Sequence, residues 1–181
     1  MEKLIEKFKA SMVKELKSEL KKKNDFEIPK ITKIVVSAGI GDFKEDKNKV
    51  EKIAKEIAKI TGQKAKVNLS TKAVSAFKLR IGQPVGLTVT LRGERMYDFI
   101  DRLVNVALPR VRDFKGLSLK AFDNQGNYSL GIRDFSIFPE IKFEEITENF
   151  GLQVNVKTTA TNKEDALALL KKLGFPFEKV N

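Results

Sequence analysis

Apolar residues recur along much of this chain with the period of an amphipathic helix. Over residues 3–22 they lie three or four apart, with lysines and glutamates between them, which predicts a first helix that ends at Lys21-Lys22-Lys23-Asn24. Cations suit the C-terminal end of a helix dipole, and these lysines would equally suit a contact with phosphate. A second helix is expected over 47–60 and is stopped by Gly62.

Two more helices are predicted in the second half of the chain. The apolar positions from Met96 to Ala107 share one helical face, and Pro109 ends that helix. Thr161 and Glu164 have the spacing of a capping box, which predicts a last helix from that point to Leu173.

Strands are predicted where apolar residues alternate with polar ones or form short β-branched runs. The first predicted strand covers 30–38 and stops at Gly39-Ile40-Gly41. The segment 70–84 has no clear period and is expected to be the longest loop. The other predicted strands cover 64–69, 85–91 and 152–156, with short strands near 117–122 and 128–132.

The order of these elements predicts the fold class. Strands and helices interleave without the regular βαβ rhythm of a doubly wound sheet, so we expect an α+β fold with a mainly antiparallel sheet and helices packed on one face. Such a sheet leaves its other face available to a ligand. A chain of 181 residues can bury roughly 70% of its unfolded surface in one core, so we expect one domain over 1–181.

Positive charge is concentrated in the first two thirds of the chain. Residues 1–120 hold 28 Lys and Arg against 15 Asp and Glu, whereas residues 121–181 hold 7 against 9. From Ile57 to Gly93 the chain runs for 37 residues without an Asp or Glu while it carries seven cations. This acid-free segment predicts a surface for a nucleic-acid backbone. A generally basic, solvated protein is the alternative.

The residue types that the chain lacks narrow its chemistry. No Cys and no His are present, which excludes disulfides, thiolate metal sites and cysteine nucleophiles, and leaves acid–base catalysis to perturbed carboxylates or lysines. Charged residues interrupt the apolar run at the N-terminus, and no apolar stretch approaches the roughly 18 residues of a membrane span. We therefore expect an intracellular protein with no export signal and no membrane partner.

Three short motifs resemble chemical sites but favour structural roles. Gly39-Ile40-Gly41 lies between a strand and a helix, yet Lys44 replaces the third glycine of a dinucleotide-binding turn, so a flexible turn is favoured. Glu144 and Glu145 lack a catalytic context and are expected on a solvated face. The run from Asp123 to Asn127 lacks the bidentate Glu of a calcium loop and is expected to be a turn. No metal or cofactor is expected.

Cations and one aromatic ring meet in the predicted loop 70–84. Cations neutralise phosphate and a planar ring can stack on a base, so Phe77 and its basic neighbours could bind RNA. Phe77 could equally anchor the loop to the core. The loop is expected to be flexible and to become ordered on its RNA. A second basic cluster uses arginine throughout, which suits phosphate or the carboxylates of a protein partner: Arg92, Arg95, Arg102, Arg110 and Arg112.

Longer motifs carry a resemblance to a known family. The run from Leu91 to Phe99 and the run from Ala107 to Leu117 closely resemble the bacterial 5S-rRNA-binding protein of the large ribosomal subunit, which is universal large-subunit ribosomal protein number five. The match covers essentially the whole chain in order. Further matching motifs are Gly62-Gln63-Lys64, Phe77-Lys78-Leu79-Arg80, Gly126-Asn127-Tyr128-Ser129, Ile137-Phe138-Pro139-Glu140-Ile141 and Phe175-Pro176-Phe177.

The resemblance implies a fold, a location and partners. It implies a single α+β domain, a ferredoxin-like variant typical of the family, without enzymatic activity and without a cofactor. It also implies binding to 5S rRNA in the central protuberance of a cytoplasmic ribosome, beside 23S rRNA and the other 5S-associated ribosomal proteins. Contacts with the P-site tRNA, and with small-subunit ribosomal protein thirteen across an intersubunit bridge, follow from the same resemblance.

Family roles carry over to the residues that match the family pattern. The implied 5S rRNA surface includes Ser37, Gly39, Gln63, Thr90 and Arg92. The implied tRNA-contacting loop carries Lys72, Phe77, Lys78 and Arg80. The implied intersubunit bridge lies at Pro109, Arg110, Arg112, Asp113 and Lys115, with 133–143 as a further bridge region.

Three stretches depart from the family pattern. Ser37-Ala38 stands where the family usually has Asn-Met, so the 5S contact there lacks the paired donor and acceptor of an amide. The stretch Asn68 to Thr71 stands where the family loop usually carries more basic residues. Arg133-Asp134-Phe135-Ser136 replaces a commoner stretch containing Glu-Gln.

Two other functions are consistent with the residues alone. A small enzyme acting on a phosphorylated or RNA substrate would need a lysine with a depressed pKa inside a pocket. A nonspecific nucleic-acid-coating protein would bind 5S rRNA no better than an unrelated RNA of equal length.

Overall fold

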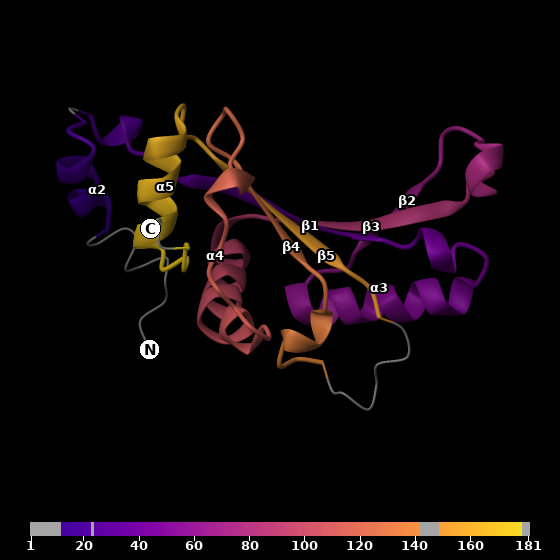
Figure 1. Cartoon of the computed structure of the whole chain (residues 1–181). Coiled ribbons are helices and arrows are strands. Elements are labelled where there is room, and N and C mark those ends of the chain that lie inside the picture. Colours follow the sequence, from indigo (N-terminus) through magenta and orange to yellow (C-terminus); the bar gives the residue numbers. More distant parts are fainter. Residues whose placement is uncertain (1–11, 23, 142–148, 179–181) are drawn as a thin grey trace. The chain divides into compact units, whose positions relative to one another are not determined.

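The computed structural model describes residues 12–22, 24–141 and 149–178, and Figure 1 traces them from indigo to yellow. The strands of this part form one five-stranded antiparallel sheet in the order β2-β3-β1-β5-β4. The predicted α+β fold with a mainly antiparallel sheet is thus confirmed. The strands are β1 (Ile31–Gly39), β2 (Lys66–Leu69), β3 (Pro84–Leu91), β4 (Tyr128–Ile132) and β5 (Leu152–Thr158). The α-helices are α2 (Val13–Glu19), α3 (Lys47–Thr61), α4 (Gly93–Arg102) and α5 (Lys163–Lys172).

The chain divides into two compact units. Unit 1 comprises Met1–Ile34, Leu91–Leu130 and Asn155–Asn181, and unit 2 comprises Val35–Thr90 and Gly131–Val154. The expectation of one domain over the whole chain stays a prediction. Each unit is built from segments that are distant in the sequence, so neither could fold from one continuous stretch.

In unit 2, strands β1 and β3 have one buried face and one partly exposed face. Along β3, Leu87, Val89 and Leu91 are buried, whereas Thr88 and Thr90, which alternate with them, are partly exposed. β1 repeats this alternation, because successive side chains of a strand point to opposite faces. We call the outward side the open face. In unit 2 it carries Ser37 and Gly39 of β1, Lys66 and Asn68 of β2, and Gly86, Thr88 and Thr90 of β3.

Helix α3 supplies the apolar side that unit 2 needs for a core. Its Val50, Ile53, Ile57 and Ile60 are all buried, which is the helical period that the sequence predicted. The Asp46 carboxylate caps the N-terminus by accepting hydrogen bonds from the backbone N–H groups of Asn48 and Lys49. Gly62 ends α3 as predicted. It has a left-handed φ of 68°, a conformation that glycine adopts with little strain because it has no Cβ. Its N–H donates to the Ala58 carbonyl at 2.8 Å.

Ion pairs join α2 and α5 in unit 1. The Lys172 ammonium lies 2.9 Å from Glu15 and 3.7 Å from Glu19, and these carboxylates raise the pKa of Lys172. The Lys22 ammonium lies 3.0 Å from Asp165. The lysines after the first helix were predicted to serve the helix end or phosphate, and the ion pair gives Lys22 a different role. Residues 3–11 of the predicted helix and Lys23 lie outside the described residues.

Three boundaries differ from the predictions, each for a local reason. No strand covers 117–122, because the Ser118 side chain caps a single 3₁₀ turn at Leu119–Ala121 and leaves only isolated bridges on either side. The predicted capping box at Thr161 is wrong, since α5 starts after Asn162 and that residue makes no side-chain cap. The helix after Met96 does run to Pro109, but its last turns widen into a π-helix over Leu103–Ala107 before a 3₁₀ turn at Leu108–Arg110.

Candidate nucleic-acid interface

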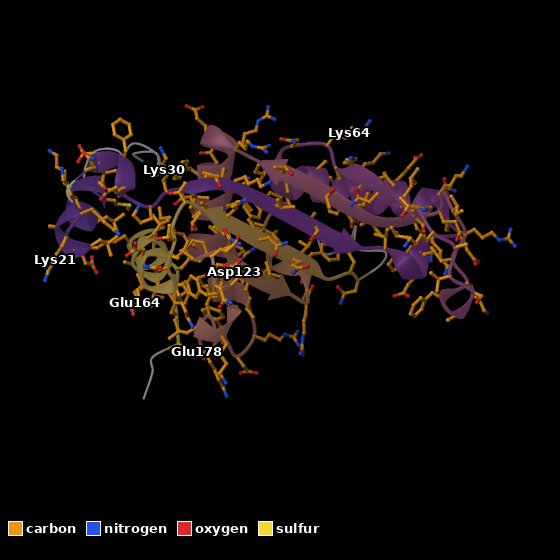
Figure 2. All side chains as sticks on the ribbon, turned by 90° about the horizontal axis from the view of Figure 1, so that it is seen from above. Lys21, Lys30, Lys64, Asp123, Glu164 and Glu178 are labelled. Carbon is orange, nitrogen blue, oxygen red and sulfur yellow. The ribbon has the colours of Figure 1, made fainter. Side chains whose placement is uncertain are left out.

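The acid-free segment is concentrated in one compact unit. From Ile57 to Thr90 it supplies the last turn of α3, all of β2, the β2–β3 connection and nearly all of β3, and these belong to unit 2. Lys64, which is labelled in Figure 2, is an exposed cation between α3 and β2. Because no carboxylate interrupts this part of the chain, every charge that it contributes to the surface of unit 2 is positive.

Small polar groups line the open face over β2 and β3. The two strands pair antiparallel with Lys66 opposite Thr88, and the Asn68 amide lies 3.2 Å from the Thr88 hydroxyl. A Cβ on Gly86 would lie 3.3 Å from the Ala38 carbonyl oxygen, so a larger residue there would crowd β1. The hydroxyl and amide groups of these short side chains can donate to sugar and phosphate oxygens.

Most of the predicted 5S rRNA residues belong to unit 2. Ser37 and Gly39 lie at the end of β1, and the Gln63 side chain donates to the Thr90 carbonyl oxygen at 3.4 Å. The structure therefore brings Gln63 and Thr90 together, beside the start of the acid-free strand pair. Arg92 belongs to unit 1, where it is exposed and precedes α4 in an extended conformation without capping that helix.

The segment 70–83 is a long loop that folds back on itself as a hairpin. We call it the basic hairpin; it connects β2 to β3 and projects past their ends in Figure 1. Val74 and Leu79 exchange two backbone hydrogen bonds of 3.0 and 3.1 Å. Ser70 likewise donates to Gln83 and accepts from Gly82. The predicted long loop is confirmed, because the described chain has no strand between β2 and β3. Its backbone pairs could not be predicted, since they leave no periodic pattern in the side chains.

The tip of the basic hairpin presents a bare aromatic ring among cations. The Phe77 side chain is 74% exposed, so the alternative in which it anchors the segment to the core is wrong. Lys72, Lys78 and Arg80 are exposed around it. Lys78 has a left-handed backbone φ of 48°, which is uncommon for a residue other than glycine and needs stabilising contacts nearby. The Lys44 ammonium donates to the Phe77 carbonyl and supplies such a contact.

The predicted bridge residues form an exposed loop in unit 1 whose base is fixed. Pro109 and Arg110 lie in a 3₁₀ turn, and Arg112, Asp113 and Lys115 are exposed after it. The Leu117 N–H then donates to the Pro176 carbonyl at 2.7 Å, and the Leu117 carbonyl accepts from Glu178. The further bridge region begins in unit 2, where the Asp134 carboxylate caps a short turn, and its residues from 142 on lie outside the described chain.

The weaker motifs have structural roles or lie outside the described residues. Asp123, labelled in Figure 2, opens the predicted turn and accepts hydrogen bonds from Gln125 and Asn127. Partial burial raises the pKa of this carboxyl, but those hydrogen bonds and Lys157 outweigh it and hold the pKa below its ordinary value. Glu144 and Glu145 lie outside the described residues. Among the described residues, no cluster of carboxylates could hold a metal ion and no helix is long and apolar enough to cross a membrane.

Sequence reasoning missed two cations beside the basic hairpin. Lys44 and Lys47 precede and begin α3, and both line the groove that the hairpin borders. Neither falls in the acid-free segment, because Glu45 and Asp46 lie between them in the sequence. Only the fold reveals them, since contact between residues this far apart in the sequence leaves no local pattern.

Known proteins match the chain along nearly its full length. The family model described as ribosomal protein L5 matches residues 24–80, and the model that describes the C-terminus of this ribosomal family matches residues 84–177. The large ribosomal subunit protein uL5 of Trichlorobacter lovleyi is 49% identical over 98% of this chain and 99% of its own. The uL5 of Natranaerobius thermophilus is 46% identical over the same shares. The uL5c of Gracilaria tenuistipitata is 48% identical over 91% of this chain and 92% of its own.

Proposed function

Because the chain belongs to the ribosomal protein L5 family, we propose that it anchors 5S rRNA in the large ribosomal subunit through the open face of unit 2. Members of this family are structural proteins of the large ribosomal subunit and not enzymes, so the protein acts in translation within the ribosome, which is cytoplasmic in bacteria. The enzymatic alternative is thereby excluded.

The observation that carries the 5S proposal is the coincidence of the open face with the acid-free segment. Thr88, Thr90 and Asn68 lie on a polar strand surface, and no Asp or Glu lies within that stretch of the chain. RNA helices are recognised mainly by shape, through phosphates and 2′-hydroxyl groups, and such a surface offers hydroxyl and amide partners for both. Ser37, Gly39, Gln63 and Thr90 are the proposed contacts within unit 2, and Arg92 is the proposed contact from unit 1.

The basic hairpin is the proposed contact with the P-site tRNA. Lys72, Lys78 and Arg80 would neutralise phosphates, and the bare Phe77 ring could stack on a base or a ribose. The exposed loop of Pro109, Arg110, Arg112, Asp113 and Lys115 is the proposed contact with small-subunit ribosomal protein thirteen. 23S rRNA and the other 5S-associated proteins complete the set of proposed partners in the central protuberance.

A charge placed at Gly39 tests the open face. No atom lies within 4 Å of a Cβ built on this glycine, so both Gly39→Asp and its neutral isostere Gly39→Asn fit without steric conflict. Only the aspartate would repel a phosphate. We expect Gly39→Asp to bind 5S rRNA at least about tenfold more weakly than Gly39→Asn at physiological salt. Equal affinities of the two variants for 5S rRNA would show that the end of β1 does not contact the RNA.

Arg92 offers a second test, from unit 1. Its side chain is exposed and caps no helix, so Arg92→Gln should leave the melting temperature unchanged while it weakens 5S rRNA binding by about three- to tenfold. Lys171→Gln is the matched control, because Lys171 is an exposed cation on α5, far from the acid-free segment in the sequence. If both variants weaken binding equally, only the net charge matters and Arg92 makes no specific contact.

A further inference from the structure

A short stretch of unit 1, which we call the clamp segment (residues 174–178), lies against both ends of an exposed loop. We call that loop the arginine loop (residues 109–115). At the start of the loop, a Cβ built on Gly174 would lie 3.4 Å from Cγ1 of Val104, which belongs to the π-helix that leads into the loop. At the end of the loop, the clamp segment pairs with Leu117 in an isolated parallel β-bridge. One segment therefore borders the loop on both sides.

The β-bridge at the end of the loop consists of two backbone hydrogen bonds. The Leu117 N–H donates to the Pro176 carbonyl at 2.7 Å, and the Glu178 N–H donates to the Leu117 carbonyl at 3.1 Å. Glu178 is labelled in Figure 2. Gly116 makes this approach possible, because a Cβ there would lie 2.7 Å from the Glu178 nitrogen. Two chains this close together leave the end of the loop little freedom to move.

The clamp segment is itself firmly attached. The Phe177 ring stacks on Phe122 with centroids 5.7 Å apart, and it meets Tyr128 edge to face at 5.6 Å. At the other end of the segment, the Phe175 N–H donates to the Leu170 carbonyl of α5 at 3.0 Å. The segment therefore connects the loop to α5 and to an aromatic cluster of unit 1.

The arginine loop has a defined backbone between its two ends. It follows the buried Leu108, whose carbonyl accepts a hydrogen bond from the Val111 N–H at 3.1 Å. Asp113 has a left-handed φ of 51°, which is uncommon for a residue other than glycine. Such a conformation persists where the surrounding structure imposes it. The attachment at Leu117 is one such constraint, four residues further along the chain.

We propose that the clamp segment positions the arginine loop for the carboxylates of a protein partner. Arg110, Arg112 and Lys115 are exposed cations of this loop. An arginine fork pairs with a carboxylate in a fixed planar geometry. A loop whose backbone is already held loses less conformational entropy on binding, so its contact is stronger. The inference rests on the proposed contact with small-subunit ribosomal protein thirteen, and it adds positioning residues that lie outside the contact itself.

A matched pair of variants at Glu178 tests the positioning role. Glu178→Pro and Glu178→Ala both remove the exposed carboxylate, but only proline also removes the N–H that donates to Leu117. We expect the NMR order parameters of the Arg112 and Lys115 amides to fall from about 0.85 in Glu178→Ala toward about 0.6 in Glu178→Pro. Equal order parameters in the two variants would overturn the proposal.

Phe177→Leu loosens the clamp segment by a second route. Leucine removes the ring that contacts Phe122 and Tyr128, and it keeps every backbone N–H. We expect a smaller fall in the same order parameters. Phe26→Leu is the matched control, because Phe26 is a 93% exposed ring elsewhere in unit 1. If Glu178→Pro does not fold, this pair decides, and equal order parameters in the two leucine variants would overturn the proposal.

Crosslinking inside the ribosome tests the effect on the partner. The chain contains no cysteine, so Lys115→Cys gives the purified protein a single site for a benzophenone maleimide. The labelled protein is incorporated into large subunits, which are joined to small subunits and irradiated. We expect the crosslink to small-subunit ribosomal protein thirteen to form with at least about threefold lower yield in Glu178→Pro than in Glu178→Ala.

The outcomes separate this inference from the proposed contact. If the probe reaches small-subunit ribosomal protein thirteen equally in both variants, the contact stands and the positioning role is wrong. If it reaches that protein in neither variant nor in the otherwise unmodified chain, the proposed contact is wrong. The order parameters of the Arg112 and Lys115 amides then decide alone whether the clamp segment holds the loop.

Discussion

The Lys44 ammonium donates a hydrogen bond to the backbone carbonyl of Phe77, which lies 33 residues further along the chain. Lys44 follows the 3₁₀ turn at the end of β1, and Phe77 is at the tip of the basic hairpin. This contact ties the hairpin tip to the segment that leads into α3. It also holds the carbonyl before Lys78, whose left-handed φ of 48° would otherwise be disfavoured.

Lys44→Gln should loosen the basic hairpin. An exposed hydrogen bond contributes about 0.5–1.5 kcal/mol, so amide hydrogen exchange at Val74 and Leu79 should become about two- to tenfold faster. Hydrogen exchange followed by NMR would measure both amides, which pair with each other across the hairpin. Lys52→Gln serves as the control for lost charge, and an unchanged exchange rate in Lys44→Gln would mean that the backbone pairs hold the hairpin without help.

The limits of sequence reasoning are clearest in this hairpin. Periodic patterns predicted α3, β3 and β5, and a β-branched run predicted β1, because burial selects apolar side chains at these positions. The hairpin is stabilised by backbone hydrogen bonds and by the distant Lys44, and neither produces a periodic pattern of apolar side chains in the sequence. The same reason explains the false strand at 117–122, where apolar side chains such as Phe122 pack against the rings of Tyr128 and Phe177 without forming a ladder.

The candidate site was predictable to a similar extent. The gap in acidic residues marked the segment that forms β2, the hairpin and most of β3, because charge composition is visible without a fold. The pairing of Gln63 with Thr90 depends on two elements meeting, and the sequence motifs alone could not place it. The groove was invisible for the same reason, since Lys47 and Leu69 approach it from different elements.

Gly116→Ala should strongly destabilise unit 1. Gly116 has a φ of 108°, and a Cβ there would lie 2.7 Å from the backbone nitrogen of Glu178. Backbone cannot move aside as a flexible side chain can, so we expect the free energy of unfolding to fall by about 2–4 kcal/mol in a urea titration. Gly131→Ala is the control, because no atom lies within 4 Å of its Cβ and its φ is not positive. A loss below about 1 kcal/mol at Gly116 would contradict the tight approach.

Tyr128 should make the fold sensitive to alkali. Burial, with a smaller effect of Glu178, raises the pKa of Tyr128 to about 12 from the ordinary 10.0. The folded state therefore keeps its phenol proton where the unfolded chain has lost it. The stabilisation is fully present below pH 10.0 and is lost as the pH rises toward about 12, by no more than about 3 kcal/mol.

Unfolding measured across that pH range tests the role of Tyr128. The chain contains two tyrosines, and burial also raises the pKa of Tyr97, so Tyr97→Phe is the background in which the Tyr128 phenol is observed alone. In this background, tyrosinate absorbance should rise only near the upper end of the range, together with unfolding. Adding Tyr128→Phe should flatten the alkaline loss of stability. An ordinary titration near pH 10.0 without unfolding would contradict the burial of this phenol.

The central claim is that this member of the L5 family recognises 5S rRNA and does not merely attract polyanions. Competition between 5S rRNA and a structured RNA of equal length, measured with the purified protein across a salt series, tests it most directly. If roughly six phosphates are neutralised, log affinity should fall with a slope of about −4 to −5 against log salt, and the preference for 5S rRNA should persist at physiological salt. Equal binding of both RNAs, lost together as salt rises, would contradict the claim and identify a nonspecific nucleic-acid-coating protein.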